Sequence, residues 1–192
     1  VLGQRGLQDD VMWLIASPIC FCAYFITTHW TKADLFAYVS LAAVGTTLAA
    51  ALEVFDAHET VVQLSFASLL SVIMLLSYRL RTSPSASYAY APLRNVSHAG
   101  MPLLVFMAMA LWGDYTGCRS CPAGATWLAI LGVGVGVLFY GANNVLFKWI
   151  ATRWVVAGLF PVLVWMVIQE LAFTDTWMAV ILMGISLVYL WI

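Results

Sequence analysis

Carboxylates and histidines are the side chains of this sequence that could carry acid–base or metal chemistry, and they are few. The 192 residues hold nine Asp and Glu, eight Lys and Arg, and three His. Glu170 stands out because it follows Gln169 inside an apolar run, where an ionised carboxylate is costly. We expect it to face the bundle interior or an outer vestibule, protonated or hydrogen-bonded, with Glu53 across the interface.

The histidines do not form a metal-binding pattern. His29, His58 and His98 give neither HxxxH nor HExxH, the spacings that place two zinc ligands on one helix face. The sequence therefore predicts no catalytic residue, no cofactor and no bound transition metal. One alternative stays open: calcium or another cation could bind an outer acidic group, although solvated helix ends explain that group as well. The group comprises Glu53, Asp56, His58, Glu59, Asp114, Glu170 and Asp175.

Small polar side chains recur inside apolar stretches. Ser65, Ser68 and Ser71 follow one another at a spacing of three, and Asn143 and Asn144 interrupt a later apolar run. Such residues indicate either a polar conduction path through a bundle or hydrogen bonds between helices, and the second use is the more frequent one.

Two further motifs concern cross-linking and packing. Cys118 and Cys121 lie in a Gly-rich loop before Pro122 and predict a disulfide; a redox CxxC and free thiols or thiols with other partners are the alternatives. Gly132 and Gly136 form a GxxxG pattern, which lets another helix approach closely. We expect this glycine face to pack against a neighbouring helix or a partner.

The composition identifies the solvent of the elements that carry these residues. Hydrophobic residues make up 64% of the chain and charged residues 9%, with a mean hydropathy of +0.95. A soluble domain needs roughly a quarter of its residues charged, so the composition excludes one. The net charge of -1, with its few basic residues dispersed, also argues against a nucleic-acid partner. The bilayer is the expected surrounding.

The apolar stretches predict an all-α polytopic membrane protein, a seven-transmembrane-helix bundle forming a single domain over 1–192. A helix needs about 20 apolar residues to span the hydrocarbon core. We expect this domain to belong to a longer chain. The segment from Arg79 to Ser97 is expected as an irregular loop at the membrane surface. The predicted spans are 11–30, 35–55, 60–78, 99–112, 124–150, 154–173 and 176–192.

Charge predicts the orientation of this bundle. With seven spans, six of the eight basic residues fall on one side, and only Arg5 and Arg119 fall on the other. By the positive-inside rule, the N-terminus is outside and the C-terminus cytoplasmic. The basic residues of the cytoplasmic side are Lys32, Arg79, Arg81, Arg94, Lys148 and Arg153.

Some segments resemble the myomaker-like seven-transmembrane family of the ceramidase-related hydrolase superfamily. They are the turn 31–34, the run 62–80 ending Leu-Ser-Tyr-Arg-Leu, and 158–191 with its Asp-Thr-Trp junction. Hydrolases of that superfamily place paired zinc-binding histidines at the start of the last span, where this chain has Thr174 and Met178. They place an acid in the third span, where this chain has Leu64 or Ser65. The resemblance thus implies a module without the metal chemistry.

These observations lead to a hypothesis about function. We expect a non-catalytic membrane anchor or scaffold of a larger assembly, in the plasma membrane or an endomembrane, with other membrane or extracellular protein subunits as partners. The alternatives are a small transporter or channel that uses the polar lane, and a membrane hydrolase.

Overall fold

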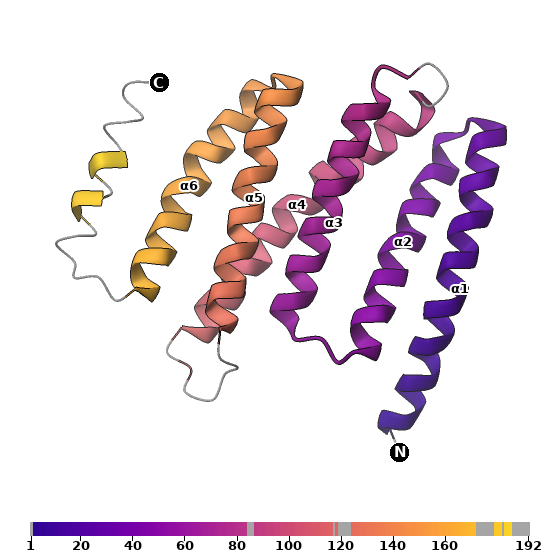
Figure 1. Cartoon of the computed structure of the whole chain (residues 1–192), viewed down its shortest axis with the longest axis horizontal. Helices are drawn as coiled ribbons and strands as arrows, with labels where there is room; N and C mark the ends of the chain where they lie inside the picture. Colours follow the sequence, from indigo (N-terminus) through magenta and orange to yellow (C-terminus); the bar gives the residue numbers. More distant parts are fainter. Residues whose placement is uncertain are drawn as a thin grey trace. The chain divides into compact units, whose positions relative to one another are not determined.

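The computed structural model describes residues 2–83, 87–116, 118, 124–171, 179–181 and 183–185. Within these ranges the regular structure is helical and no strand occurs (Figure 1). Six helices of the described part are long and apolar enough to cross a membrane. The protein is therefore an all-helical, multi-pass membrane protein. The seventh predicted span, 176–192, lies largely outside the described residues.

The helices group into two compact units, 1–103 and 104–192. The first unit contains α1 (Leu2–Thr31), α2 (Asp34–Val54), α3 (Glu59–Leu80) and the first part of α4 (Ser87–Tyr115). The second contains the rest of α4, α5 (Ala125–Phe147) and α6 (Ile150–Glu170). Five of the predicted spans thus match helices, although α5 ends before the predicted Ile150. It ends there because Lys148 takes a left-handed backbone conformation, with φ of 54°.

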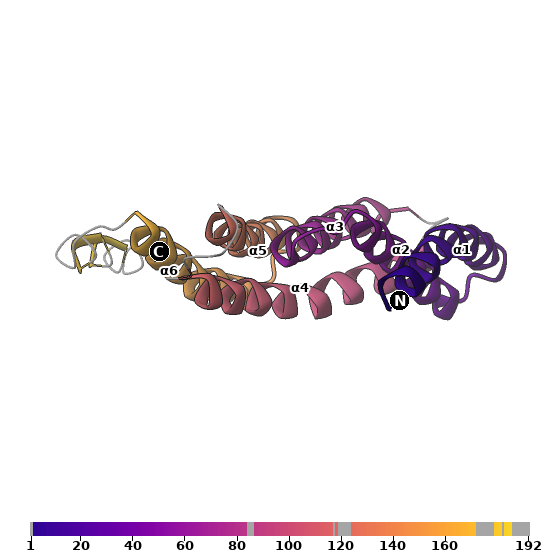
Figure 2. The ribbon, with the colours of Figure 1, turned by 90° about the horizontal axis from the view of Figure 1, so that it is seen from below.

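In the first unit, α1 and α2 lie side by side along their length (Figure 1, Figure 2). Small residues make this contact possible, because they let two helix backbones approach closely. A hydrogen bond from Thr46 Oγ1 to Ser17 Oγ, 3.1 Å long, joins the two helices. The buried residues of α2 are Ala37, Ser40, Ala43 and Ala50.

Helix α3 buries one stripe of residues spaced alternately by three and four. This spacing keeps the stripe on one side of an α-helix. The cap residue His58 starts the helix, since its Nδ1 accepts a hydrogen bond from the Thr60 backbone N–H at 3.4 Å. The stripe is polar at both ends and apolar in the middle; it consists of Thr60, Gln63, Ala67, Leu70, Met74 and Ser77.

The prediction of an irregular loop from Arg79 to Ser97 was wrong for most of that range, because α4 begins at Ser87 and includes both Pro92 and Pro102. The expected span 99–112 is correspondingly too short. Prolines are tolerated in membrane helices where packing re-satisfies the backbone. Here Pro92, Leu93, Ser97 and Met101 are buried, so the packing of one helix face outweighs the local signal of the prolines.

The second unit has its own apolar core between α4, α5 and α6. The ring of the exposed Trp165 packs edge to face against the buried Trp112, with centroids 4.9 Å apart. Met166 of α6 is fully buried there. The buried cluster consists of Ala108, Leu111, Trp112, Ala129, Ile130, Val133 and Met166.

Candidate functional site

Glu170, the acid singled out by the sequence, lies at the last turn of α6 and is half-buried. Its Oε1 accepts a hydrogen bond from Thr126 Oγ1 of α5 at 2.6 Å. The carboxylate is therefore hydrogen-bonded within the second unit, and the bond links the end of α6 to the start of α5. Glu53 is exposed near the end of α2 in the first unit, and its proximity to Glu170 stays a prediction.

The three serines of α3 do not share one buried face. Ser68 is exposed, while Ser65 and Ser71 are half-buried. Ser71 Oγ donates to the Ala67 carbonyl of its own helix at 2.9 Å. The buried stripe of α3 has Ala67, Leu70 and Met74 at its middle. Neither the serines nor this stripe therefore gives α3 a continuous polar face.

The two asparagines of α5 have different roles. Asn143 is fully buried, and its Nδ2 donates to the Phe139 carbonyl at 3.1 Å. Asn144 Oδ1 accepts from Arg153 Nε of α6 at 3.1 Å. Asn144 thus fastens the short turn between α5 and α6, which corresponds to the interhelical use of such residues rather than to a conduction path.

Glycines mark two close contacts between helices. Gly132 and Gly136 are both buried, and a Cβ added to Gly136 would overlap Val105 Cγ2 of α4. A second contact has no GxxxG signal in the sequence: a Cβ on Gly100 of α4 would lie 2.6 Å from Leu70 Cδ1 of α3. Only the docking of α3 and α4 identifies Gly100 as a packing residue.

A groove opens between α1 and α2 near one end of the first unit. Its volume is about 220 Å³, and it is lined by Trp13, Thr46, Ala49, Ala50 and Glu53. One carboxylate is the only charged group of the lining, and it is exposed. The acidic group expected at this end therefore contributes a single residue to the groove.

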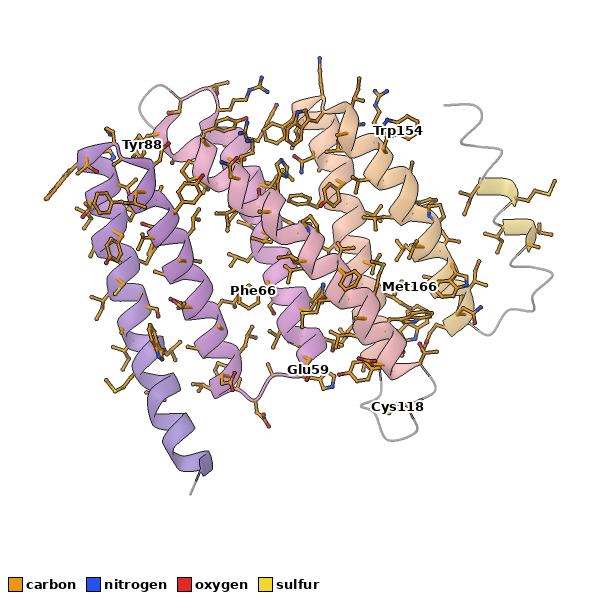
Figure 3. All side chains as sticks on the ribbon, turned by 180° about the vertical axis from the view of Figure 1, so that it is seen from behind. Glu59, Phe66, Tyr88, Cys118, Trp154 and Met166 are labelled. Atoms are coloured by element: carbon orange, nitrogen blue, oxygen red, sulfur yellow. The ribbon has the colours of Figure 1, made fainter. Side chains whose placement is uncertain are left out.

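At the opposite end of the first unit, basic and aromatic side chains contact one another across helices. This is the end where α1 and α3 stop and where α2 and α4 begin (Figure 3). We call this set the basic-aromatic cluster. It consists of His29, Lys32, Tyr38, Tyr88, Tyr90, Arg94 and Asn95.

The contacts of the cluster connect three helices. A hydrogen bond of 3.2 Å joins His29 Nδ1 and Tyr88 Oη, and Lys32 Nζ lies 4.6 Å from the centroid of the same Tyr88 ring. Arg94 Cζ lies 5.3 Å from the Tyr90 ring centroid. In the sequence, the lysine and the arginine of this cluster indicated only the orientation of the bundle. Tyr88 and Tyr90 lie beside a basic stretch, which was the available sequence signal for this cluster. The prediction of an irregular loop over these residues gave no reason to expect contacts among them.

Of the four cysteines, Cys20 and Cys22 are free thiols on exposed positions of α1. Cys118 follows α4, and its backbone N–H donates to the Tyr115 carbonyl at 3.1 Å. Cys121 lies outside the described residues, so the disulfide between Cys118 and Cys121 stays a prediction. Across the described ranges, no three His, Cys, Asp or Glu side chains come together as a metal site would require.

Comparison with known proteins supplies no relative from which a site could be transferred. No protein-family model, no curated protein and no solved structure matches this chain. The function has to follow from the contacts and exposed faces of the helices themselves.

Proposed function

We propose that this chain is a non-catalytic membrane anchor and scaffold that holds a partner transmembrane helix against the outward face of α1. The orientation proposed for it has the N-terminus outside and seven spans, in the plasma membrane or an endomembrane. The resemblance to the myomaker-like family, without the zinc-site residues, supports the same reading.

The observation that carries the proposal is a seam on the side of α1 that faces away from α2. Its residues alternate in spacing between four and three, as in the contact line of two supercoiled helices. Large residues recur every seven positions, and alanines lie between them. The exposed seam consists of Met12, Ala16, Ile19, Ala23 and Ile26.

The opposite side of α1 is covered by α2 and illustrates close packing against a neighbouring helix. There Ser17 and Thr28 are buried, and the Tyr24 ring stacks on Phe36 of α2 with centroids 6.3 Å apart. Lipid chains solvate an apolar helix as well as a protein does, so helix association in membranes depends on close packing. Ala16 and Ala23 would permit that close approach, while Met12, Ile19 and Ile26 would fill the spaces between partner side chains.

The hydroxyl groups of the described spans support a static role rather than transport. Many of them donate to a carbonyl one turn earlier in their own helix, which satisfies the donor without any polar lane. Their bonds measure between 2.7 and 2.9 Å; the donors include Thr28, Ser40, Thr47, Ser71 and Ser77.

The test measures the size of the assembly that contains the chain after gentle extraction from its native membrane. Changing Ala16→Leu together with Ala23→Leu fills the spaces of the seam, and we expect the chain to leave the larger complex. Both residues are exposed, so the thermal stability of the chain itself is expected to stay the same. Ala42→Leu, at an exposed position of α2, is the matched control and is expected to leave the complex intact.

Two results would contradict the proposal. One is an assembly of unchanged size with both alanines replaced, which would mean that the seam faces lipid. The other is an ion flux in proteoliposomes that disappears with Glu170→Gln, because this substitution keeps the Thr126 hydrogen-bond acceptor and removes only the ionisable group.

A further inference from the structure

We propose that the basic-aromatic cluster of the first unit binds the headgroup of an anionic phospholipid. This inference goes beyond the scaffold role and does not depend on the α1 seam, because the cluster lies at the junctions of the helices rather than on that seam.

Positive charge is in excess at this end of the unit. Lys32 follows α1, Arg79 and Arg81 lie at the end of α3, and Arg94 lies near the start of α4. Asp34, in the first turn of α2, is the one acid at these helix ends. Among the described residues, none of the four basic side chains forms an ion pair with a carboxylate; the contacts of Lys32 and Arg94 are those with tyrosine and asparagine. The charge is therefore available to an anion.

Aromatic rings hold two of the cations in place. Tyr88 is half-buried and contacts both His29 and Lys32, so its ring fixes the Lys32 ammonium at the end of α1. A ring occupies one side of an ammonium, and its N–H donors on the other side remain free to bind phosphate oxygens.

Arg94 is positioned in a comparable way. Its guanidinium lies over Tyr90 and donates from Nε and Nη2 to Asn95 Oδ1, at 3.4 and 3.2 Å. Asn95 Nδ2 donates in turn to Tyr38 Oη of α2 at 2.9 Å. The other edge of the guanidinium, formed by Nη1 and Nη2, can offer two parallel donors to a phosphate.

Exposed apolar side chains beside the cluster favour a lipid over a soluble phosphate. Trp30 and Leu35, on either side of Lys32 in the sequence, are 80% and 68% exposed. Large apolar side chains beside a cation provide contact for acyl chains just below a headgroup, and tryptophan is enriched at this membrane depth. A soluble anion would gain nothing from these two residues.

The experiment uses the full chain in phosphatidylcholine nanodiscs and a phosphatidic acid with brominated acyl chains, because bromine quenches tryptophan fluorescence on contact. We expect this lipid to quench more strongly than brominated phosphatidylcholine at equal content. Replacing Trp30→Phe is expected to remove that excess, and Lys32→Asn to weaken the apparent affinity about five-fold, the effect of one juxtamembrane charge.

Lys148→Asn is the matched control. Lys148 and Lys32 each come directly after a helix and take a left-handed backbone conformation, with φ of 54° and 57°. Asparagine must therefore adopt the same backbone conformation at both positions, and both substitutions remove one positive charge. The control is expected to keep the affinity of the unmodified protein. An equal loss in both variants, or an excess that survives Trp30→Phe, would overturn the proposal. Full competition by inorganic phosphate would assign the cluster to a soluble anion instead.

Discussion

At the scale of single residues, the glycines of α5 show that equal residue types can have opposite energetic roles. Gly136 packs on Val105 so closely that a Cβ would overlap it, whereas a Cβ on Gly141 meets no atom within 4 Å. Alanine has a higher helix propensity than glycine, by about 1 kcal/mol. Whether replacing a glycine by alanine raises or lowers the stability of the protein therefore depends on the atoms around that glycine.

We predict that Gly136→Ala lowers the free energy of unfolding by about 1–3 kcal/mol, because the added methyl group overpacks the contact with α4. Gly141→Ala is expected to raise it by up to about 1 kcal/mol through helix propensity alone. Thermal unfolding of both variants in the same detergent checks the two signs.

Val105→Ala offers a check on the cause. It removes the methyl group that a Cβ on Gly136 would meet, so the double variant should lose less stability than the sum of the two single changes. Strict additivity would show that Gly136→Ala acts by some other route.

At the scale of one element, α3 places residues of the same type in different surroundings, one buried and one exposed. Leu70 and Leu76 belong to the same apolar run, but Leu70 is 8% exposed and lies against Gly100, while Leu76 is 48% exposed. The buried stripe follows the helix period, so neighbouring leucines fall on different sides. Hydropathy alone assigns the two residues the same value.

We predict that Leu70→Ala destabilises the protein by about 2–5 kcal/mol, since it opens a cavity between α3 and α4. Leu76→Ala leaves lipid or detergent around the shortened side chain and is expected to change stability by no more than about 0.5 kcal/mol. Equilibrium unfolding in mixed micelles measures both variants. Equal losses would mean that the observed face of α3 is not the packed one.

At the scale of the whole molecule, orientation is the property that the charges predict. The turn between α2 and α3 carries Asp56, and α3 begins with the acid Glu59, whereas the segment after α3 begins with the basic residue Arg81. Because basic loops are retained in the cytoplasm, the two connections should lie on opposite sides of the membrane.

We predict that a cysteine introduced as Asp56→Cys reacts with an impermeant maleimide in intact cells, while Ser83→Cys reacts only after the membrane is opened. The measurement uses a protein in which the four native cysteines are replaced by serine. The same protein without an introduced cysteine is the control. Labelling of the Ser83→Cys protein in intact cells would reverse the proposed topology.

The sequence by itself determined the class of the protein and the approximate spans of α1, α2, α3, α5 and α6. Span length and hydropathy are sums over neighbouring residues, so they need no knowledge of what each helix contacts. Local sequence patterns fail at Pro92. A local rule marks proline as a helix breaker, and the sequence does not reveal the buried face that keeps α4 helical.

Only the tertiary structure decided which polar and small residues work together. Lys32 meets Tyr88, Thr126 meets Glu170, and Gly100 meets Leu70, and each pair joins two separate elements of the fold. The rotation of each helix about its axis selects these partners. Helices that are apolar on most sides leave that rotation undefined, because lipid accepts every face, and it becomes fixed only when side chains interlock.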